Sequence, residues 1–346
     1  MFGKVKNLAF VFVLSAGVAV SSVAIAQTAD VAKEAAKKQV DQPLNNAPVW
    51  KEIRQSNPNN MTTTSRNPEG NVLIQSDGLT WRQIRNGPIT LYGGALVAFM
   101  LAAIGLFYKR KGTIKLKAPA TGKTIQRFSD RERMMHWATA ISFSILGISG
   151  LILFFGKHIL QPVLGYTLFS WIARLCIVLH NFVGPIFFLC AIGLFFTFVR
   201  DNFPKAYDLT WLKKGGGLAS GEHIPSDRFN AGEKVWFWGG LALLGIVVSL
   251  SGLVLDFPNF AQTRGVMQTA NIVHVIGALL FIIGSFGHIY MGTVGMEGAY
   301  KAMREGKVDE AWAKEHHEYW YNDIKSGKIK PAAASAKPAP ASQAKA

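Results

Sequence analysis

The sequence predicts an all-α integral membrane protein, built as a bundle of four transmembrane helices with one additional N-terminal transmembrane helix. Of the 346 residues, 49% are hydrophobic and only 17% are charged. The apolar residues gather in blocks of about 20, the length that crosses a bilayer as a helix. Five such blocks follow a shorter N-terminal one, and basic residues flank them. The chain is therefore expected to cross the membrane five times.

The N-terminal residues 1–26 have the pattern of a secretory signal peptide. A short basic start precedes an apolar run from Leu8 to Val20, and Ala24-Ile25-Ala26 supplies an A-x-A cleavage site. An uncleaved anchor helix is the alternative, although the run is short for a full span. Residues 27–88 are polar and rich in Asn, Thr, Gln and Pro, so we expect an extracytoplasmic segment, with spacing at 29–40 that favours a short helix.

The membrane-spanning part begins with the additional helix, expected over residues 89–108 after Pro88. Lys109-Arg110-Lys111 then acts as a stop-transfer signal and opens a basic cytoplasmic connector, residues 109–133. The four-helix domain is expected over 134–292. Its four apolar segments are Met134–Phe155, Leu175–Val199, Val235–Leu255 and Ala270–Gly292.

The C-terminal residues divide into two parts. Residues 293–330 are predicted to form a cytoplasmic interfacial region, because Tyr300 to Lys328 combine helical spacing with many aromatic residues. Residues 331–346 are rich in Ala, Pro and Lys and are expected to be disordered.

The distribution of Lys and Arg predicts the orientation. Residues 108–133 hold nine of them, 200–234 hold six and the tail after 292 holds nine, whereas 156–174 hold two and 256–270 hold one. By the positive-inside rule the first three regions are cytoplasmic. The chain is therefore expected in a bacterial inner membrane, with a cytoplasmic C-terminus and an extracytoplasmic mature N-terminus.

The formal net charge of +16 could indicate a protein that binds nucleic acid. We exclude this function because the basic residues flank apolar blocks and form no nucleic-acid motif. Cys176 and Cys190 share one apolar segment and form neither a CxxC nor a CxxCH pattern. We therefore expect neither a disulfide scaffold nor covalently attached haem, and interpret both cysteines as packing residues.

Four histidines lie inside the predicted spans. His274 and His288 are fourteen residues apart in one apolar segment, so they share a helix face roughly 21 Å apart. With the predicted topology, His180 lies level with His274 near the outer side, and His136 level with His288 near the inner side. Ionisable groups in a bilayer are costly and usually functional. Two bis-histidine b-type haems, each holding one iron, would use all four residues.

Other uses of these histidines remain alternatives. A dinuclear metal site normally adds carboxylates or thiolates, but none of the four spans contains Asp or Glu, and Asp256 lies at an outer end. A proton relay more often includes intramembrane Asp or Glu. His158, His223, His316 and His317 lie outside the predicted spans, where a solvated surface or interface role is expected, and none is proposed as a ligand.

Several short motifs stand out between residues 125 and 325: Arg133-Met134-Met135-His136-Trp137, His180 with Gly184, Arg228-Phe229-Asn230-Ala231-Gly232-Glu233-Lys234, His274 with His288, and Trp312-Ala313-Lys314-Glu315-His316-His317. In these motifs the chain resembles the gamma subunit, the cytochrome b membrane anchor, of respiratory formate dehydrogenase. The histidine set alone is similar to that of the cytochromes b of hydrogenases and thiosulfate reductases. The loop motif, residues 228–234, and the tail motif, residues 312–317, narrow the resemblance to formate dehydrogenase. Residues 1 to about 115 depart from the compact four-helix form of that family.

The resemblance implies haem ligation by His136, His180, His274 and His288, and a quinone site near His288, His136, Asn230 and Gly232. It also implies an alpha subunit with molybdenum or tungsten and a beta subunit with iron-sulfur clusters. Electrons would pass from the beta subunit through the outer and inner haems to the quinone. This chain would not itself oxidise formate. The alternatives are an anchor for a hydrogenase or thiosulfate reductase, and a haem-free structural anchor or transporter.

Overall fold

The computed structural model describes residue 54 and residues 76–218, 220–260 and 262–332. The predicted signal peptide and most of the predicted extracytoplasmic segment lie outside the described residues, as do residues 333–346. The chain divides into two compact units. The first contains residues up to 95 together with 257–272, and the second contains 96–256 together with the residues from 273 on.

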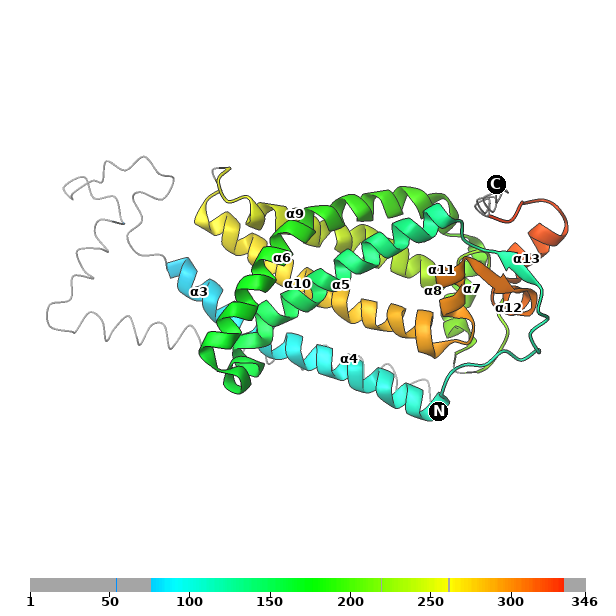
Figure 1. The fold of residues 1–346 in the computed structure, drawn as a ribbon, viewed down its shortest axis with the longest axis horizontal. Helices are drawn as coiled ribbons and strands as arrows, with labels where there is room; N and C mark the ends of the chain where they lie inside the picture. The colour runs from blue at the N-terminus through cyan, green and yellow to red at the C-terminus, as the bar shows by residue number, and fades with distance from the viewer. Residues whose placement is uncertain (1–53, 55–75, 219, 261, 333–346) are drawn as a thin grey trace, which may run out of the picture. The chain divides into compact units, whose positions relative to one another are not determined.

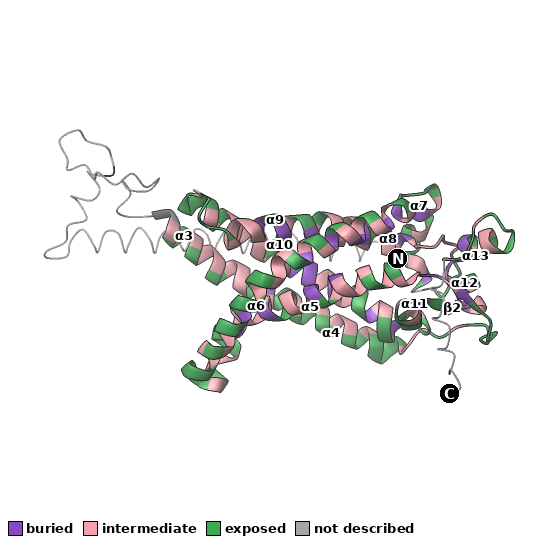
Figure 2. Cartoon of the chain, turned by 45° about the horizontal axis from the view of Figure 1, so that its top comes forward, coloured by how far each residue is buried: buried purple, intermediate pink, exposed green. Residues whose placement is uncertain are grey.

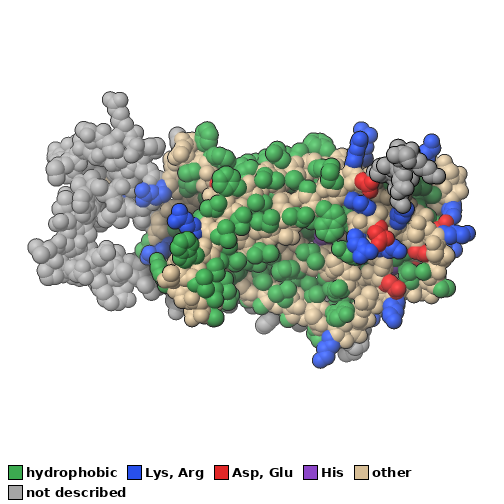
Figure 3. Space-filling view, viewed as in Figure 1, with side chains coloured by type: hydrophobic (Ala, Val, Ile, Leu, Met, Phe, Trp, Pro, Cys, Tyr) green, Lys and Arg blue, Asp and Glu red, His purple; other side chains and the backbone are tan. Residues whose placement is uncertain are grey.

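The prediction of an all-α membrane protein with five spans is confirmed. Within the described residues, five helices are long and apolar enough to cross a membrane: Gly78–Lys111, Asp130–Ile159, Gln161–Asn202, Ala231–Asp256 and Arg264–Gly295. Large apolar side chains stand exposed along them, including Phe99, Phe196 and Leu243. Figures 2 and 3 show this exposed apolar surface along the helices. Such a surface suits a hydrocarbon solvent, where apolar exposure costs nothing.

The described part of the first unit begins with a helix that starts earlier than predicted. Helix α3 (Ser76–Ile84) continues through a π-helical turn, η1 (Arg85–Ile89), into α4 (Thr90–Lys111). The predicted span began only after Pro88, which instead lies inside the π-helical turn. The wider turn accommodates the proline ring, and the hydroxyl of Thr90 donates a hydrogen bond to the carbonyl of Arg85 at 2.8 Å.

The bundle of the second unit consists of α5 (Asp130–Ile159), α6 (Gln161–Phe198), a continuous helix, and the part of α10 (Arg264–Tyr290) from Val273 on. The continuous helix is α8 (Ala231–Val235), η4 (Trp236–Leu244) and α9 (Gly245–Asp256). These helices run side by side (Figure 1). A capping box starts α5, in which Ser129 and Glu132 satisfy each other's backbone N–H groups.

Helices α5 and α6 extend beyond the predicted spans, so that nearly all of residues 156–174 is helical. Helix α5 continues to Ile159 and α6 starts at Gln161, with a single break at Gly165, where φ is 75°. Only glycine adopts that φ readily. Phe169 reaches back to α5, where a Cβ at Gly156 would lie 2.6 Å from its ring. This contact between the two helices explains why the segment folds as helix instead of as loop.

An aromatic layer fills the middle of the bundle. Phe187 and Phe281 are buried, and Phe143 and Trp236 pack against them. Phe281 lies seven residues from both His274 and His288 on α10, and Phe187 lies seven residues after His180 on α6. Seven residues are two helical turns, so each ring shares a helix face with a histidine. The layer therefore separates the two levels at which the histidines lie.

One end of the bundle carries a polar cap, which we define as residues 112–129, 203–230 and 296–332. It holds a two-stranded antiparallel sheet, β1 (Thr124–Gln126) with β2 (Lys307–Asp309), in which Ile125 pairs with Val308. Short helices surround the sheet: α7 (Ala206–Lys213), α11 (Ala299–Glu305), α12 (Glu310–His316) and α13 (Glu318–Lys325). Lysines, arginines, aspartates and glutamates gather over the cap in Figure 3.

The predicted continuous helix from Tyr300 to Lys328 is therefore wrong in detail. Gly306, with φ of 82°, ends α11, and His317, with φ of −142°, separates α12 from α13. The two tryptophans of this tail are also buried inside the cap, since Trp312 is 2% exposed and Trp320 is 3% exposed. They pack with Phe128 of the connector and Val308 of β2. The tail is thus a folded part of the second unit.

Candidate functional site

The structure brings the four span histidines together as the two expected pairs. The ring centres of His180 on α6 and His274 on α10 are 6.0 Å apart. Those of His136 on α5 and His288 on α10 are 6.2 Å apart. A metal-bound imidazole nitrogen lies about 2.0–2.1 Å from its metal, so two imidazoles on opposite sides of one metal need ring centres about 6 Å apart. Both pairs meet that spacing.

The His180/His274 pair is held by hydrogen bonds to its Nδ1 atoms. His274 Nδ1 lies 2.9 Å from the carbonyl oxygen of Val248, and His180 Nδ1 lies 2.8 Å from the hydroxyl of Ser149. Because a carbonyl only accepts, Nδ1 of His274 carries the proton and Nε2 keeps the lone pair that ligates a metal. Glycines make room for both rings: a Cβ at Gly150 or Gly252 would lie 3.3 or 3.1 Å from a histidine Cε1.

The His136/His288 pair has a different environment. Trp236 stacks on His288, with ring centres 5.4 Å apart and planes tilted by 17°. His136 Nδ1 is buried and has no hydrogen-bond partner in the part of the chain that the structure describes. A Cβ at Gly287 would meet no atom within 4 Å, so there is space beside His288.

A cavity of about 1460 Å³ joins this histidine pair to the cap. His136 and His288 line it together with Asn230 and Gly232, the two residues that the sequence analysis associates with a quinone. His180 and His274 are not among its lining residues. The four residues expected near one another at the inner side therefore share one cavity.

Asn230 and Gly232 also shape the start of α8. The side-chain oxygen of Asn230 accepts from the backbone N–H of Glu233 at 3.0 Å, while Glu233 accepts from the backbone N–H of Asn230 at 2.8 Å. This capping box uses the amide oxygen of Asn230, but its side-chain nitrogen makes no hydrogen bond to the described residues. A Cβ at Gly232 would lie 2.9 Å from the ring of Trp211, so α7 packs closely there.

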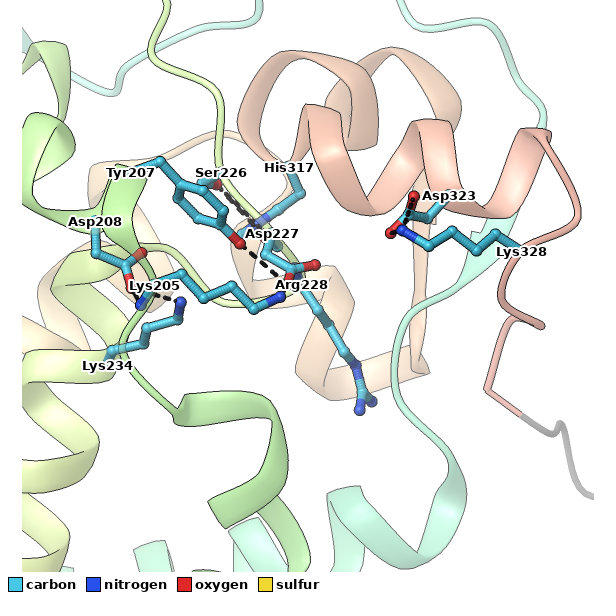
Figure 4. A network of polar contacts seen from close by, with 10 residues as sticks. All are labelled: Lys205, Tyr207, Asp208, Ser226, Asp227, Arg228, Lys234, His317, Asp323 and Lys328. Atoms are coloured by element: carbon cyan, nitrogen blue, oxygen red, sulfur yellow. Dashed lines mark hydrogen bonds and ion pairs between the residues drawn. The ribbon is translucent and has the colours of Figure 1, made fainter.

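A network of ion pairs supports this loop from the cap, and Figure 4 shows the part of it that includes Lys234 and Asp208. Lys234 and Asp208, both buried, pair at 2.7 Å and join α8 to α7. Arg127, 4% exposed, pairs with Glu233 at 3.0 Å. Arg228 bridges Glu132 and Asp201 at 2.8 and 2.5 Å. The loop that carries Asn230 is therefore fixed at several points.

The same network contains groups whose pKa values are displaced. Burial, reinforced by the charge of Asp227, raises the pKa of Tyr207 to about 12. His317 is 1% exposed, which contradicts the expected solvated role, and its Nδ1 donates to the carbonyl of Asp227 at 2.6 Å. Burial and the nearby charge of Arg127 hold the pKa of His317 well below 6.5. His317 is thus a neutral structural residue of the cap.

Sequence reasoning missed the residues that orient the histidines. Ser149, Val248 and Trp236 lie inside apolar blocks, and nothing in the linear pattern relates them to a histidine on another helix. The contact between Asn230 and Glu233 could have been found from the sequence, because Asn230-x-x-Glu233 is a capping-box pattern.

The residues at both pairs fit haem better than a metal held by protein alone. Among the described residues, no group of three His, Cys, Asp or Glu side chains comes together to hold a metal ion. A porphyrin needs only two axial ligands from the protein, and each pair offers two imidazoles. The hydrogen bond at Nδ1 of His274 leaves Nε2 free to bind a metal. The open space beside Gly287 leaves room for a porphyrin ring.

Comparison with known proteins places the chain in a family. The family model described as prokaryotic cytochrome b561 matches residues 127–306, more than half of the chain. The cytochrome b556(fdo) subunit of formate dehydrogenase from Escherichia coli K12 is 32% identical over 206 residues, which cover 58% of this chain and 94% of that protein. The nitrate-inducible cytochrome b556(Fdn) subunit from the same strain is 30% identical over 214 residues, covering 60% and 95%. A Haemophilus influenzae formate dehydrogenase cytochrome b556 subunit is 29% identical over 197 residues, covering 55% and 79%.

The chain therefore belongs to the prokaryotic cytochrome b561 family, and the five apolar helices of its described part make it a multi-pass membrane protein. Within that family it groups with the cytochrome b subunits of formate dehydrogenases, as its motifs predict. Membership of a cytochrome b family implies haem b.

Proposed function

We propose that this chain is the membrane anchor of a formate dehydrogenase, and that it passes electrons through two b haems to a quinone. The observation that carries this proposal is the pairing of four histidines from three helices, with ring centres 6.0 and 6.2 Å apart. His180 and His274 would ligate one haem iron, and His136 and His288 the other. The haems, when bound, supply one-electron redox chemistry, and the protein positions and tunes them.

The hydrogen bonds at Nδ1 support the ligand assignment. Val248 and Ser149 fix the ring orientations of His274 and His180, and a bond from Nδ1 to a carbonyl raises the basicity of the opposite nitrogen. Trp236 limits rotation of the His288 ring by stacking on it. Each haem site would thus have its own means of orienting an axial ligand.

The large cavity supports quinone binding beside the His136/His288 pair. Its volume of about 1460 Å³ exceeds the roughly 300–1,000 Å³ of most small-molecule sites, so it has room for the edge of a haem and a second apolar ligand. The side-chain nitrogen of Asn230 can donate to a quinone carbonyl while its oxygen caps α8. At Gly232 the absence of a side chain leaves room for the ring of Trp211, which also lines the cavity.

The charge distribution supports an orientation in which the cap is cytoplasmic. Three basic regions, 108–133, 200–234 and the tail, contribute to the cap end, whereas 156–174 and 256–270 are nearly free of Lys and Arg. In a bacterial inner membrane, this orientation puts the His180/His274 pair outward. An iron-sulfur beta subunit would then deliver electrons there, from formate oxidised by an alpha subunit with molybdenum or tungsten. The quinone would take its protons from the cytoplasm.

The test uses membranes that contain the whole complex, with quinone oxidation blocked. Adding formate should reduce the b haems, as seen in reduced-minus-oxidised absorbance spectra. Rapid haem reduction by hydrogen, with none by formate, would instead assign the chain to a hydrogenase. The absence of any b-haem spectrum from the purified complex would leave only a haem-free anchor or transporter.

A further inference from the structure

Residues Gly112–Lys117, which follow the additional helix α4, form part of the wall of the large cavity. Lys111, Thr113, Ile114, Lys115 and Lys117 line this cavity together with His136, His288 and Asn230. The segment precedes residues 127–306, the part of the chain that the family model matches. A wall of the candidate quinone site therefore comes from outside the matched cytochrome domain.

Backbone hydrogen bonds attach this segment to the end of α10. The N–H of Ile114 donates to the carbonyl of Gly295 at 3.0 Å, and the N–H of Glu297 donates to the carbonyl of Ile114 at 3.0 Å. Ile114 thereby forms an isolated parallel bridge with Met296. The hydroxyl of Thr113 donates to the carbonyl of Val294 at 2.9 Å. The segment is bonded to a chain stretch that begins only a few residues after His288.

Further bonds join the segment to the opposite part of the cavity wall. Lys117 donates from its backbone N–H to Glu315 at 2.9 Å and from Nζ to the carbonyl of Gly221 at 2.6 Å. Both Glu315 and Gly221 line the cavity. Residues 112–117 thus cross from the end of α10 to the loop before α8, which carries Asn230.

Helix α4 itself is held against the same part of α10. Phe107 and Tyr108 pack edge-on against Tyr290, with ring centres 6.2 and 6.4 Å apart. Tyr290 lies two residues after His288 and is 8% exposed. These contacts fix where α4 ends and therefore where the 112–117 segment begins.

We propose that the 112–117 segment is a specificity-determining wall of the quinone site, supplied by the additional N-terminal helix, and that Ile114 contacts the quinone ring. This proposal rests on the proposed quinone site. Ile114 is half-buried and its side chain is the branched apolar group of the segment that lines the cavity. A planar apolar ring bound in this cavity would make van der Waals contact with Ile114 and accept a hydrogen bond from the side-chain nitrogen of Asn230. The size of residue 114 would then decide which ring systems fit.

The test compares Ile114→Ala and Ile114→Trp with the wild type in the intact complex. The haems are reduced with dithionite, and their oxidation is followed after adding either a tetramethylbenzoquinone or a methylnaphthoquinone. Ile114→Trp should raise the KM for the larger naphthoquinone relative to that for the benzoquinone by on the order of tenfold, because one misfitted apolar contact has an effect of that size. Ile114→Ala should lower the ratio of the KM for the naphthoquinone to the KM for the benzoquinone. Haem content and the haem spectrum should stay as in the wild type.

Leu116 provides the matched control. It lies in the same segment, but it packs against the apolar core of the cap and is absent from the cavity lining. Leu116→Ala should leave the ratio of KM values unchanged. An equal change in the Leu116 and Ile114 variants would overturn the proposal, since it would show a general effect on the segment.

A third variant separates this proposal from the quinone site on which it rests. If Asn230→Asp raises the KM for both quinones while the Ile114 variants behave like the wild type, the quinone site stands and the proposed wall is wrong. If neither Asn230 nor Ile114 variants alter quinone kinetics, the quinone site itself is wrong.

Discussion

The imidazole of His288 lies parallel to the indole of Trp236, with ring centres 5.4 Å apart. Two glycines leave room for the indole: a Cβ at Gly240 or at Gly284 would come within 2.6 Å of a Trp236 ring atom. The absence of two side chains therefore lets a large aromatic ring reach the histidine of a neighbouring helix. This arrangement makes the orientation of His288 sensitive to residues that do not touch it.

Gly284→Ala should therefore disturb the proposed haem site at His288 without disturbing the one at His274. The added methyl group must displace Trp236, because a Cβ at 2.6 Å is far inside van der Waals contact. Low-temperature absorbance and EPR spectra should show one shifted haem signal and one unchanged signal. Gly147→Ala is the control, since its Cβ would meet only Ile282 at an ordinary 3.9 Å. Two equally shifted signals would contradict this account.

Replacing any one of the four histidines should remove one of the two proposed haems from each chain. His180→Ala or His274→Ala should abolish the haem of one pair, and His136→Ala or His288→Ala that of the other, because each iron would lose an axial ligand. The pyridine haemochrome assay should fall from about two haems per chain to about one. Full haem content in all four variants would show that the pairs do not ligate haem.

Two substitutions at Asn230 should separate helix capping from quinone binding. Asn230→Ala removes the N-cap of α8 and should destabilise the protein by about 0.5–2 kcal/mol. Asn230→Asp keeps a capping oxygen but lacks the side-chain N–H donor, so it should preserve thermal stability and slow oxidation of prereduced haem by quinone. Normal quinone kinetics in a stable Asn230→Asp variant would limit Asn230 to a capping role.

The buried pair of Lys234 and Asp208 should be costly to break. Their side chains are 5% and 10% exposed, so Lys234→Met would leave the carboxylate of Asp208 buried without a counter-charge, with the backbone N–H of Lys205 at 2.7 Å as its remaining donor. Removing one member of such a pair costs about 3–5 kcal/mol, whereas replacing both by apolar residues costs much less. Thermal unfolding of the purified complex, followed by haem absorbance, should rank Lys234→Met below the double variant with Asp208→Leu. The reverse order would show that the carboxylate of Asp208 finds another partner.

The cap should lose stability in acid through His317. The folded pKa lies well below 6.5 because the ring is buried and Arg127 is near. In the unfolded chain this histidine binds a proton as the pH falls through about 6.5, whereas in the folded protein it does not. The contribution of the neutral, buried His317 to the free energy of unfolding is therefore complete above that pH and declines below it. His317→Gln should weaken the acid dependence of the unfolding temperature between about pH 5 and pH 7. His158→Gln, at an exposed position, should leave that dependence as it is.

The five spans follow from the sequence alone, because the bilayer requires about 20 apolar residues in a helix wherever the chain crosses it. The histidine pairs could also be anticipated. Once the direction of each helix was predicted from its flanking charges, the depth of a residue followed from its number. The predicted spans are shorter than the helices at 156–174 and at Pro88, where local contacts extend the helices beyond the apolar segments.

Only the tertiary structure decided what surrounds these histidines. The hydrogen bond from His274 to Val248 and the stacking of Trp236 on His288 join residues of different helices, and apolar periodicity does not encode such contacts. The folded cap likewise depends on pairing between strands nearly two hundred residues apart in the chain, Thr124–Gln126 and Lys307–Asp309. The membrane thus fixes the depth of each helix along the membrane normal, and this depth can be predicted from composition. Side-chain packing fixes the rotation and neighbours of each helix, and these are properties of the whole fold.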